Sequence, residues 1–249
     1  MRAGQAGLDS RAAPVPGAPV REPWWSPWRE LGCGLLELLL APACAACGGA
    51  VPGTGALCAV CEGALPALPP GLEDRAPAPL AACRAGAAYA GGVEEWIRRF
   101  KYPRRGLAAL DPAARAVARA LVLRAAARAP GPAPELVVPV PLHPRRLRER
   151  GFNPAARLAG WLARERGLAF DPRALRRLRD TPSQTGLDRR ARARNVRGAF
   201  AARPGFRAPR EVWLVDDVLT TGATLAAAAR ALRRAGARRI VALCAARTP

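Results

Sequence analysis

The sequence is poor in several residue types that commonly serve in binding and catalysis, with one histidine, one methionine and two tyrosines among 249 residues. Its 40 basic residues include a single lysine, Lys101, so arginine carries almost all of the positive charge. A lone lysine against this background suggests that a compact point charge is needed at that position. The one histidine, His143, precedes a proline, which is more typical of a turn, and we assign it no role as a base.

Long apolar runs are also missing. The most apolar stretch, from Gly34 to Leu40, is far shorter than the roughly 20 residues that span a bilayer. The segment before it has mixed charges and no small-residue cleavage site, which excludes a typical secretory signal. We therefore expect a cytoplasmic protein without a transmembrane helix.

What the chain does have is apolar residues and positive charge. Half of the residues are apolar, so the chain can bury a sizeable core, either as one large domain or as a main domain with a small one. The formal net charge of +21 leaves two interpretations open. It could reflect a nucleic-acid partner, or a composition biased toward arginine, because arginine occurs in nearly every helical segment.

Composition divides the chain into four parts. Residues 1–23 are rich in Ala, Pro and Gly without apolar periodicity, so we expect a disordered leader. Residues 24–65 combine an apolar helix, Trp24 to Leu40, with paired cysteines, and we favour docking of that helix on neighbouring domains over a membrane surface. Residues 66–85 form a proline-rich linker, and residues 86–249 form the main domain.

The paired cysteines Cys44, Cys47, Cys58 and Cys61 have the C-x2-C spacing of a metal site, with glycines between the pairs. Four thiolates at this spacing suit tetrahedral zinc, and a site with four protein ligands has no open position, so the zinc would be structural. An iron–sulfur cluster and a thiol–disulfide switch are the alternatives. Three further cysteines lack partner spacing, and we expect them to be buried as small hydrophobes: Cys33, Cys83 and Cys244.

The main domain reads as alternating helices and buried strands. Residues 136–140, 210–215 and 239–245 are short apolar runs typical of parallel strands. Asp111-Pro112 and Asn153-Pro154 are each an N-cap followed by proline at the first helical position. We therefore expect an α/β fold, a mostly parallel sheet flanked by helices, with ligands at the carboxyl ends of the strands.

The most informative motif runs from Val212 to Leu225, where a buried strand leads into two acids and a Thr/Gly turn that opens a helix. The turn can bind a phosphate through its amides and hydroxyls, helped by the positive end of the helix. Asp216 and Asp217 would then face the sugar hydroxyls of the same ligand, because adjacent carboxylates are unfavourable without hydroxyl or cation partners. The turn consists of Thr220, Thr221, Gly222, Ala223 and Thr224.

This motif resembles the fingerprint of type I phosphoribosyltransferases, which bind 5-phosphoribosyl pyrophosphate (PRPP). More closely, residues from about 33 to 248 resemble the ComF family of competence proteins and amidophosphoribosyltransferase homologues. Further stretches carry that resemblance: Phe100-Lys101-Tyr102, Pro139 to Asn153, Thr181 to Thr185, and Asn195 to Phe200. The family pattern often has glutamine where this chain has Pro154.

The resemblance implies a type I phosphoribosyltransferase-like domain after a small zinc-ribbon module. It implies that the segment Pro141 to Arg150 is a pyrophosphate loop, that residues 179–198 form a lid, and that Mg²⁺ binds with PRPP. A solvated basic loop is the alternative for the arginines. The implied pyrophosphate-binding residues are Arg145, Arg146, Arg148, Arg150 and Lys101.

Two functions stay open on this basis. The first is transfer of phosphoribose from PRPP to an acceptor that the sequence does not specify. The second is a non-catalytic protein of DNA uptake that uses the same fold to bind single-stranded DNA or a protein of the competence machinery.

Overall fold

The computed structural model describes residues 43–51, 55–72, 75–102, 111–180, 196 and 198–249. The predicted leader, the apolar helix Trp24 to Leu40, Cys33 and most of the predicted lid lie outside the described residues. Residues Pro42–Pro249 belong to one compact unit. The segment with the paired cysteines, residues 43–65, is called the cysteine module and is described together with the main domain.

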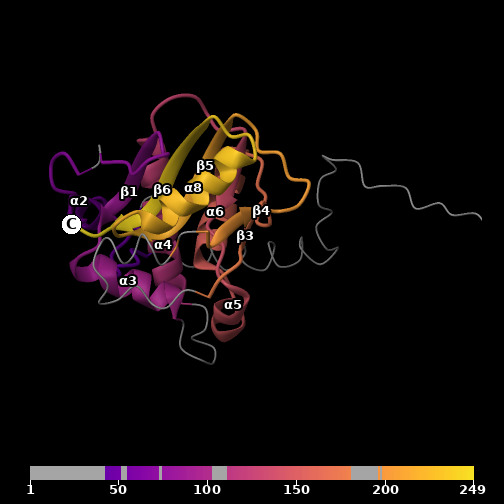
Figure 1. The fold of residues 1–249 in the computed structure, drawn as a ribbon. Coiled ribbons are helices and arrows are strands. Elements are labelled where there is room, and N and C mark those ends of the chain that lie inside the picture. Colours follow the sequence, from indigo (N-terminus) through magenta and orange to yellow (C-terminus); the bar gives the residue numbers. More distant parts are fainter. Residues whose placement is uncertain (1–42, 52–54, 73–74, 103–110, 181–195, 197) are drawn as a thin grey trace, which may run out of the picture. The chain divides into compact units, whose positions relative to one another are not determined.

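The centre of this unit is a sheet of four parallel strands in the order β1-β6-β5-β2 (Figure 1). β5 and β6 are the longest strands, and their apolar residues are buried on both faces, which is typical of a parallel sheet covered by helices. The strands are β1 Ala82–Ala88, β2 Leu136–Pro139, β5 Glu211–Leu219 and β6 Arg239–Arg247.

Helices cover both faces of the sheet. Along β5, Trp213 and Val215 belong to the core shared with α3, α4 and α6, whereas Val212 and Leu214 belong to the core shared with α8. This alternation follows from the two-residue period of a strand. The predicted fold, a mostly parallel sheet flanked by helices, is confirmed. The helices are α2 Ala59–Gly63, α3 Gly91–Lys101, α4 Pro112–Ala127, α5 Pro144–Arg150, α6 Pro154–Arg166 and α8 Ala223–Arg234.

Several elements differ from those predicted. β1 begins at Ala82, inside the predicted linker, and the antiparallel pair β3 Leu175–Arg177 and β4 Phe200–Ala202 was not predicted. β5 continues past Val215 to Leu219, so the two acids lie within the strand instead of after it. The segment predicted as a pyrophosphate loop is mostly the helix α5.

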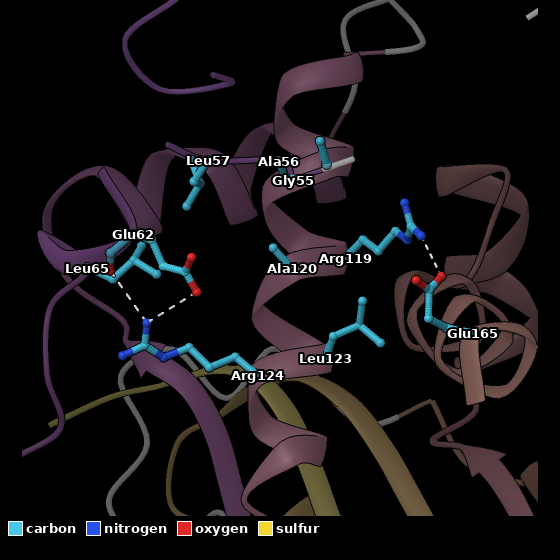
Figure 2. Close-up of a pocket in the computed structure, with 11 residues that line it drawn as sticks. Gly55, Ala56, Leu57, Glu62, Leu65, Arg119, Ala120, Leu123, Arg124 and Glu165 are labelled. Carbon is cyan, nitrogen blue, oxygen red and sulfur yellow. Dashed lines mark hydrogen bonds and ion pairs between the residues drawn. The ribbon is translucent and has the colours of Figure 1, made fainter. Parts of the chain in front are cut away.

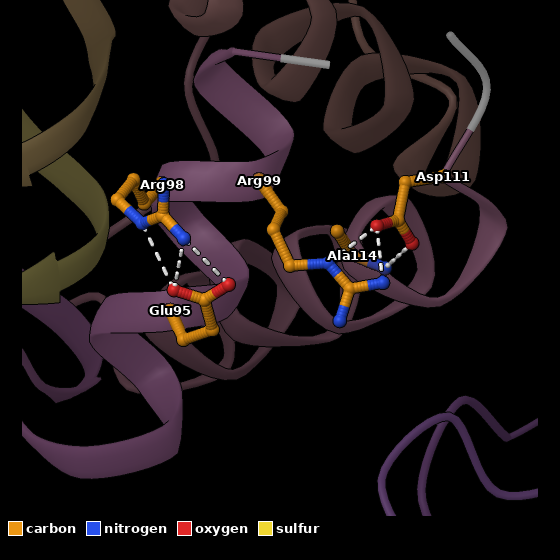
Figure 3. A network of polar contacts seen from close by, with 5 residues as sticks. All are labelled: Glu95, Arg98, Arg99, Asp111 and Ala114. Atoms are coloured by element: carbon orange, nitrogen blue, oxygen red, sulfur yellow. Dashed lines mark hydrogen bonds and ion pairs between the residues drawn. The ribbon is translucent and has the colours of Figure 1, made fainter. Parts of the chain in front are cut away.

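Both predicted helix caps are present. The Asp111 carboxylate accepts a hydrogen bond from the backbone N–H of Ala114 at 2.9 Å, and Asn153 Oδ1 accepts from that of Ala155 at 3.1 Å. Asp111 also accepts a hydrogen bond from Arg99 Nε at 2.6 Å, which ties the C-terminal part of α3 to the start of α4 (Figure 3). One carboxylate therefore links the two helices.

Replacing Asp111 with alanine is expected to lower the free energy of unfolding by about 1–2 kcal/mol, since the cap and the bridge to Arg99 are lost together. Glu95→Ala is the matched control, because the Glu95–Arg98 pair within α3 is exposed to solvent and contributes little to stability. Equilibrium urea unfolding measures both variants. Equal losses in the two would contradict a structural role for Asp111.

None of the helices in the described part of the chain is long and apolar enough to cross a membrane.

Candidate functional site

The two acids of β5 lie in a cavity of about 340 Å³ at the carboxyl ends of the parallel strands. The cavity is lined from several elements that are distant in sequence, which is the expected place for a ligand in an open α/β sheet. Its polar and charged lining residues are Tyr89, Lys101, Tyr102, Arg146, Arg150, Asn153, Arg177, Asp216, Asp217, Thr220, Thr224 and Thr248.

Asp216 and Asp217 are held by the backbone of their own strand. Asp216 Oδ1 accepts a hydrogen bond from the Asp217 N–H at 2.9 Å, and Asp217 Oδ1 accepts one from the Val218 N–H at 2.7 Å. Burial, together with the neighbouring Asp217 carboxylate, raises the pKa of Asp216 to about 7. The pair is therefore strained electrostatically, as expected of a site that gains stability when hydroxyl donors or a cation arrive.

Lys101 lies at the C-terminal end of α3, where Phe100 anchors the helix. Phe100 is 3% exposed, and its ring contacts those of Phe152 and Trp161. This packing carries Lys101 into the cavity, with its Nζ 3.0 Å from Asp217 Oδ1. Although burial lowers the pKa of Lys101, the carboxylates of Asp217 and Asp216 raise it overall, so the ammonium stays charged. Lys101, predicted to bind pyrophosphate, thus contacts an acid of the motif.

The predicted phosphate turn connects β5 to α8. Gly222 is the N-cap of α8 and has a φ of 76°, a conformation that favours glycine, so the turn depends on this residue. A Cβ at this position would also lie 2.6 Å from Cγ of Pro77. Thr220 and Thr224 line the cavity, whereas Thr221, Gly222 and Ala223 are not among its lining residues. The Thr221 hydroxyl accepts a hydrogen bond from the Ala223 N–H at 3.5 Å.

The four predicted arginines fall into two pairs, because the segment is helical. Arg146 and Arg150 are one helical turn apart and line the cavity. Arg145 and Arg148 are exposed and are not among the residues that line it, and Arg145 Nε contacts Glu149 Oε1 at 3.0 Å. The alternative interpretation of these arginines, a basic segment exposed to solvent, therefore applies to Arg145 and Arg148.

Sequence reasoning did not predict five polar residues of the cavity as site residues: Tyr89, Tyr102, Asn153, Arg177 and Thr248. Arg177 comes from β3, and no feature of the sequence distinguishes it from other arginines. The tyrosines could have been proposed because tyrosine is rare in this sequence: both tyrosines and the single lysine of the chain line this cavity. His143 does not line it and caps α5, where its Nδ1 accepts from the Arg145 N–H at 3.3 Å.

The four paired cysteines come together as predicted. Their sulfur atoms all lie within 4.8 Å of one another, and Cys47 Sγ is 3.8 Å from Cys58 Sγ. Zinc–sulfur bonds in a tetrahedron place two sulfurs about 3.8 Å apart. Backbone N–H groups of Cys47 and Cys58 lower the pKa of the Cys44 thiol to about 6, whereas the thiols of Cys47 and Cys58 raise that of Cys61 to about 12. The group could hold a metal ion such as zinc.

Cys83 and Cys244, which lack partner spacing, are buried in the sheet as expected.

A separate cavity of about 290 Å³ lies between the cysteine module and α4 (Figure 2). Its charged residues pair with each other: Arg124 Nη1 is 3.9 Å from Glu62 Oε1, and Arg119 pairs with Glu165. It lacks the acidic pair and the phosphate turn, so the cavity at the strand ends remains the candidate functional site.

No family model matches the chain. The chain is similar to DNA utilization protein YhgH of Escherichia coli K12, with 36% identity over 163 residues that cover 64% of this chain and 69% of that protein. It is 37% identical to YhgH of Salmonella typhi over 155 residues, 61% of this chain and 66% of that protein. Competence protein F of Haemophilus influenzae is 37% identical over 109 residues, 43% of this chain and 48% of that protein. The chain thus spans from about half to about two thirds of the length of these relatives.

Among solved structures, a glutamine PRPP amidotransferase from B. subtilis, complexed with ADP and GMP, aligns with a TM-score of 0.38 and 18% identity. The alignment covers 59% of this chain and 30% of that one. A likeness at this level does not establish a shared function.

Proposed function

Because this chain belongs to the ComF family, to which YhgH and competence protein F also belong, we propose that it binds PRPP at the cavity where β5 ends. One observation carries the proposal. The acids of the motif, two threonines of the turn, two arginines of α5 and Lys101 line a single cavity although they come from separate elements. Few ligands other than a phosphorylated sugar with a second anionic group would use all of these residues.

Each part of PRPP has a matching part of the cavity. Asp216 and Asp217 would accept hydrogen bonds from the ribose hydroxyls, and the turn from Thr220 to Thr224 would donate amides and hydroxyls to the 5-phosphate. Arg146 and Arg150 would neutralise the pyrophosphate. Mg²⁺ would arrive with the pyrophosphate and stabilise its negative charge, and the carboxylate and hydroxyl oxygens of the cavity are donors that this ion prefers.

We further propose that the bound PRPP donates its phosphoribosyl group. In that reaction the bond between C1 and the pyrophosphate oxygen breaks, and the bonding electrons leave with the pyrophosphate. A lone pair of the acceptor forms the new bond to C1, and the acceptor releases its proton to solvent. The chain's part is to orient the sugar through Asp216 and Asp217 and to hold the leaving pyrophosphate through Arg146 and Arg150.

The experiment that tests the proposal is a calorimetric titration of PRPP with Mg²⁺ into the folded, zinc-loaded protein. We expect saturable binding of one ligand per chain. Once binding is established, an acceptor screen that follows pyrophosphate release tests the transfer step. Absence of heat at ligand concentrations up to the millimolar range would contradict the proposal.

We also propose that the metal of the cysteine module is a structural zinc ion, and that the thiols are kept reduced in the cytoplasm. The purified protein is expected to contain one zinc per chain by mass spectrometry of the metals, and Cys44→Ser/Cys47→Ser to contain none. Chelation should increase hydrogen exchange within residues 43–65, because so small a segment has little core of its own.

The matched control for the zinc prediction is Cys83→Ser, since Cys83 lies in β1 and belongs to the core shared with α8, whereas Cys44 belongs to the other core. This variant should keep its zinc. Full zinc content in the Cys44→Ser/Cys47→Ser variant, or iron in the wild type, would contradict the proposed site.

A second function is favoured by the names of the relatives and by the net charge of +21. In this case the chain would bind single-stranded DNA, or a protein of the competence machinery, without turnover. This function would be favoured if the protein does not bind PRPP but binds oligo(dT) with an affinity that falls steeply as the salt concentration rises. Binding of PRPP with little affinity for DNA would favour the first.

A further inference from the structure

Lys101 and the arginines of α5 approach the cavity from different elements and contact different residues. Lys101 contacts Asp217, and the Asp217 and Asp216 carboxylates and the Tyr89 phenol are the groups that act on its charge. Arg146 comes from α5 and lies 3.9 Å from Asp180 Oδ1. Lys101 therefore contacts an acid of the motif, whereas Arg146 contacts Asp180 and Arg150 donates a hydrogen bond to the Tyr102 hydroxyl at 2.7 Å.

The contact of Lys101 fixes one oxygen of Asp217. Asp217 Oδ1 accepts from the Val218 N–H at 2.7 Å and lies 3.0 Å from the Lys101 ammonium. With Oδ1 engaged twice, the carboxylate is held in one orientation, and within the described part of the chain no contact involves Oδ2, so its lone pairs can accept from a ligand. Both side chains are largely buried, with 19% of Lys101 and 15% of Asp217 exposed, so solvent screens this pair weakly.

We propose that Lys101 is a positioning residue for the ribose side of the site: it is the resident counter-ion that holds the Asp217 carboxylate in the orientation that accepts a hydrogen bond from a ribose hydroxyl. This inference rests on the proposed binding of PRPP. It assigns Lys101 to a different half of the ligand from the pyrophosphate role that the family resemblance implies. It also means that the ribose half binds without a divalent cation, because the counter-charge belongs to the protein.

The choice of lysine fits this role. An ammonium group is compact and can contact one carboxylate oxygen, whereas a guanidinium tends to engage both oxygens of a carboxylate in a fork. A forked arrangement would occupy Oδ2, the oxygen that the ligand needs. The chain uses arginine at every other basic position, and this one position is lysine.

Two fragments of PRPP separate the two roles. Ribose 5-phosphate has the ribose hydroxyls and the 5-phosphate but no pyrophosphate, and free pyrophosphate with Mg²⁺ has the other half. The experiment measures the affinity of each fragment, and of PRPP, for the full-length wild type and for Lys101→Met, which keeps the length of the side chain and removes its charge. Titrations of ribose 5-phosphate are done with and without Mg²⁺.

We expect Lys101→Met to lower the affinities for ribose 5-phosphate and for PRPP by a similar factor, about tenfold to hundredfold, because the charge-assisted hydrogen bond that orients Asp217 is lost. Pyrophosphate should bind as before, within about twofold, which also shows that the variant is folded. Lys101→Arg keeps the charge and should recover part of the ribose 5-phosphate affinity. Should Lys101→Met fail to fold, Lys101→Gln replaces it: glutamine lacks the charge but can still donate to Asp217, so we expect a smaller loss of affinity for the same two ligands.

The opposite pattern overturns the inference. If Lys101→Met lowers the affinities for pyrophosphate and PRPP but leaves that for ribose 5-phosphate unchanged, Lys101 contributes to binding of the pyrophosphate. A strict requirement of ribose 5-phosphate for Mg²⁺ also contradicts a resident counter-ion. Failure of the wild type to bind any of the three ligands is a different result, because it removes the proposed function itself.

Discussion

The variant Asp216→Asn/Asp217→Asn is expected to bind PRPP at least about a hundredfold more weakly than the wild type, because two carboxyl groups that accept from ribose hydroxyls become amides. Asparagine keeps the shape of aspartate, so the loss reports on charge and hydrogen bonding. Calorimetric titration with Mg²⁺ measures it.

Glu211→Gln is the matched control for this prediction. Glu211 begins the same strand, but it lies at the amino end, where it contacts Arg239 at 3.5 Å. The control should bind PRPP within about twofold of the wild type, since ligands bind at the carboxyl ends of parallel strands. Equal affinities for the double variant and the wild type would place the site elsewhere.

The pH dependence of the free energy of unfolding should differ between the wild type and the double variant. Burial and the Asp217 charge raise the pKa of Asp216 from 3.8 to about 7, so the folded protein binds a proton that the unfolded chain releases. This group's contribution to stability is present below the lower pKa and is lost as pH rises through the higher one. The wild type should therefore lose stability over this window, and the double variant should lose less.

Gly86→Ala is expected to lower the free energy of unfolding by about 3 kcal/mol, the largest stability effect that we predict for a single methyl group. Gly86 is buried in β1, and a Cβ there would lie 2.2 Å from the backbone oxygen of Leu121 in α4. Because backbone cannot move aside as a side chain can, α4 and β1 must separate.

The matched control for this second prediction is Gly160→Ala in α6. A Cβ at Gly160 would lie 3.7 Å from the ring of Phe170, an ordinary contact, and alanine is the better helix former. This variant should be as stable as the wild type or more stable by about 0.5–1 kcal/mol. Thermal and urea unfolding compare the two. A Gly86→Ala protein as stable as Gly160→Ala would mean that α4 does not pack as closely on β1 as described.

The sequence predicted the parts of the fold that depend on local pattern. The apolar runs of β2, β5 and β6 and the caps Asp111 and Asn153 follow from residue type and spacing alone. β1 was missed because Ala82–Ala88 has no β-branched residue. Its small residues are explained only by the close approach of α4 at Gly86, a contact between segments distant in sequence.

The candidate site was predictable to a similar extent. The acids, the threonine turn and the cysteine cluster each lie within a short stretch, so their spacing is visible in the sequence. Which arginines face the cavity was not visible, because Arg146 and Arg150 differ from Arg145 and Arg148 only through the helical turn of α5. Arg177 reaches the cavity from β3, whose pairing with β4 joins residues more than twenty positions apart.

Whether the acids and turn at the end of β5 form a phosphoribosyl site can be measured by NMR, as shifts of backbone amides during titration with PRPP and Mg²⁺. We expect the largest shifts on the amides from Asp216 to Thr224, with further shifts in α5 at Arg146 and Arg150. Shifts confined to the cysteine module, or none at saturating ligand, would contradict it.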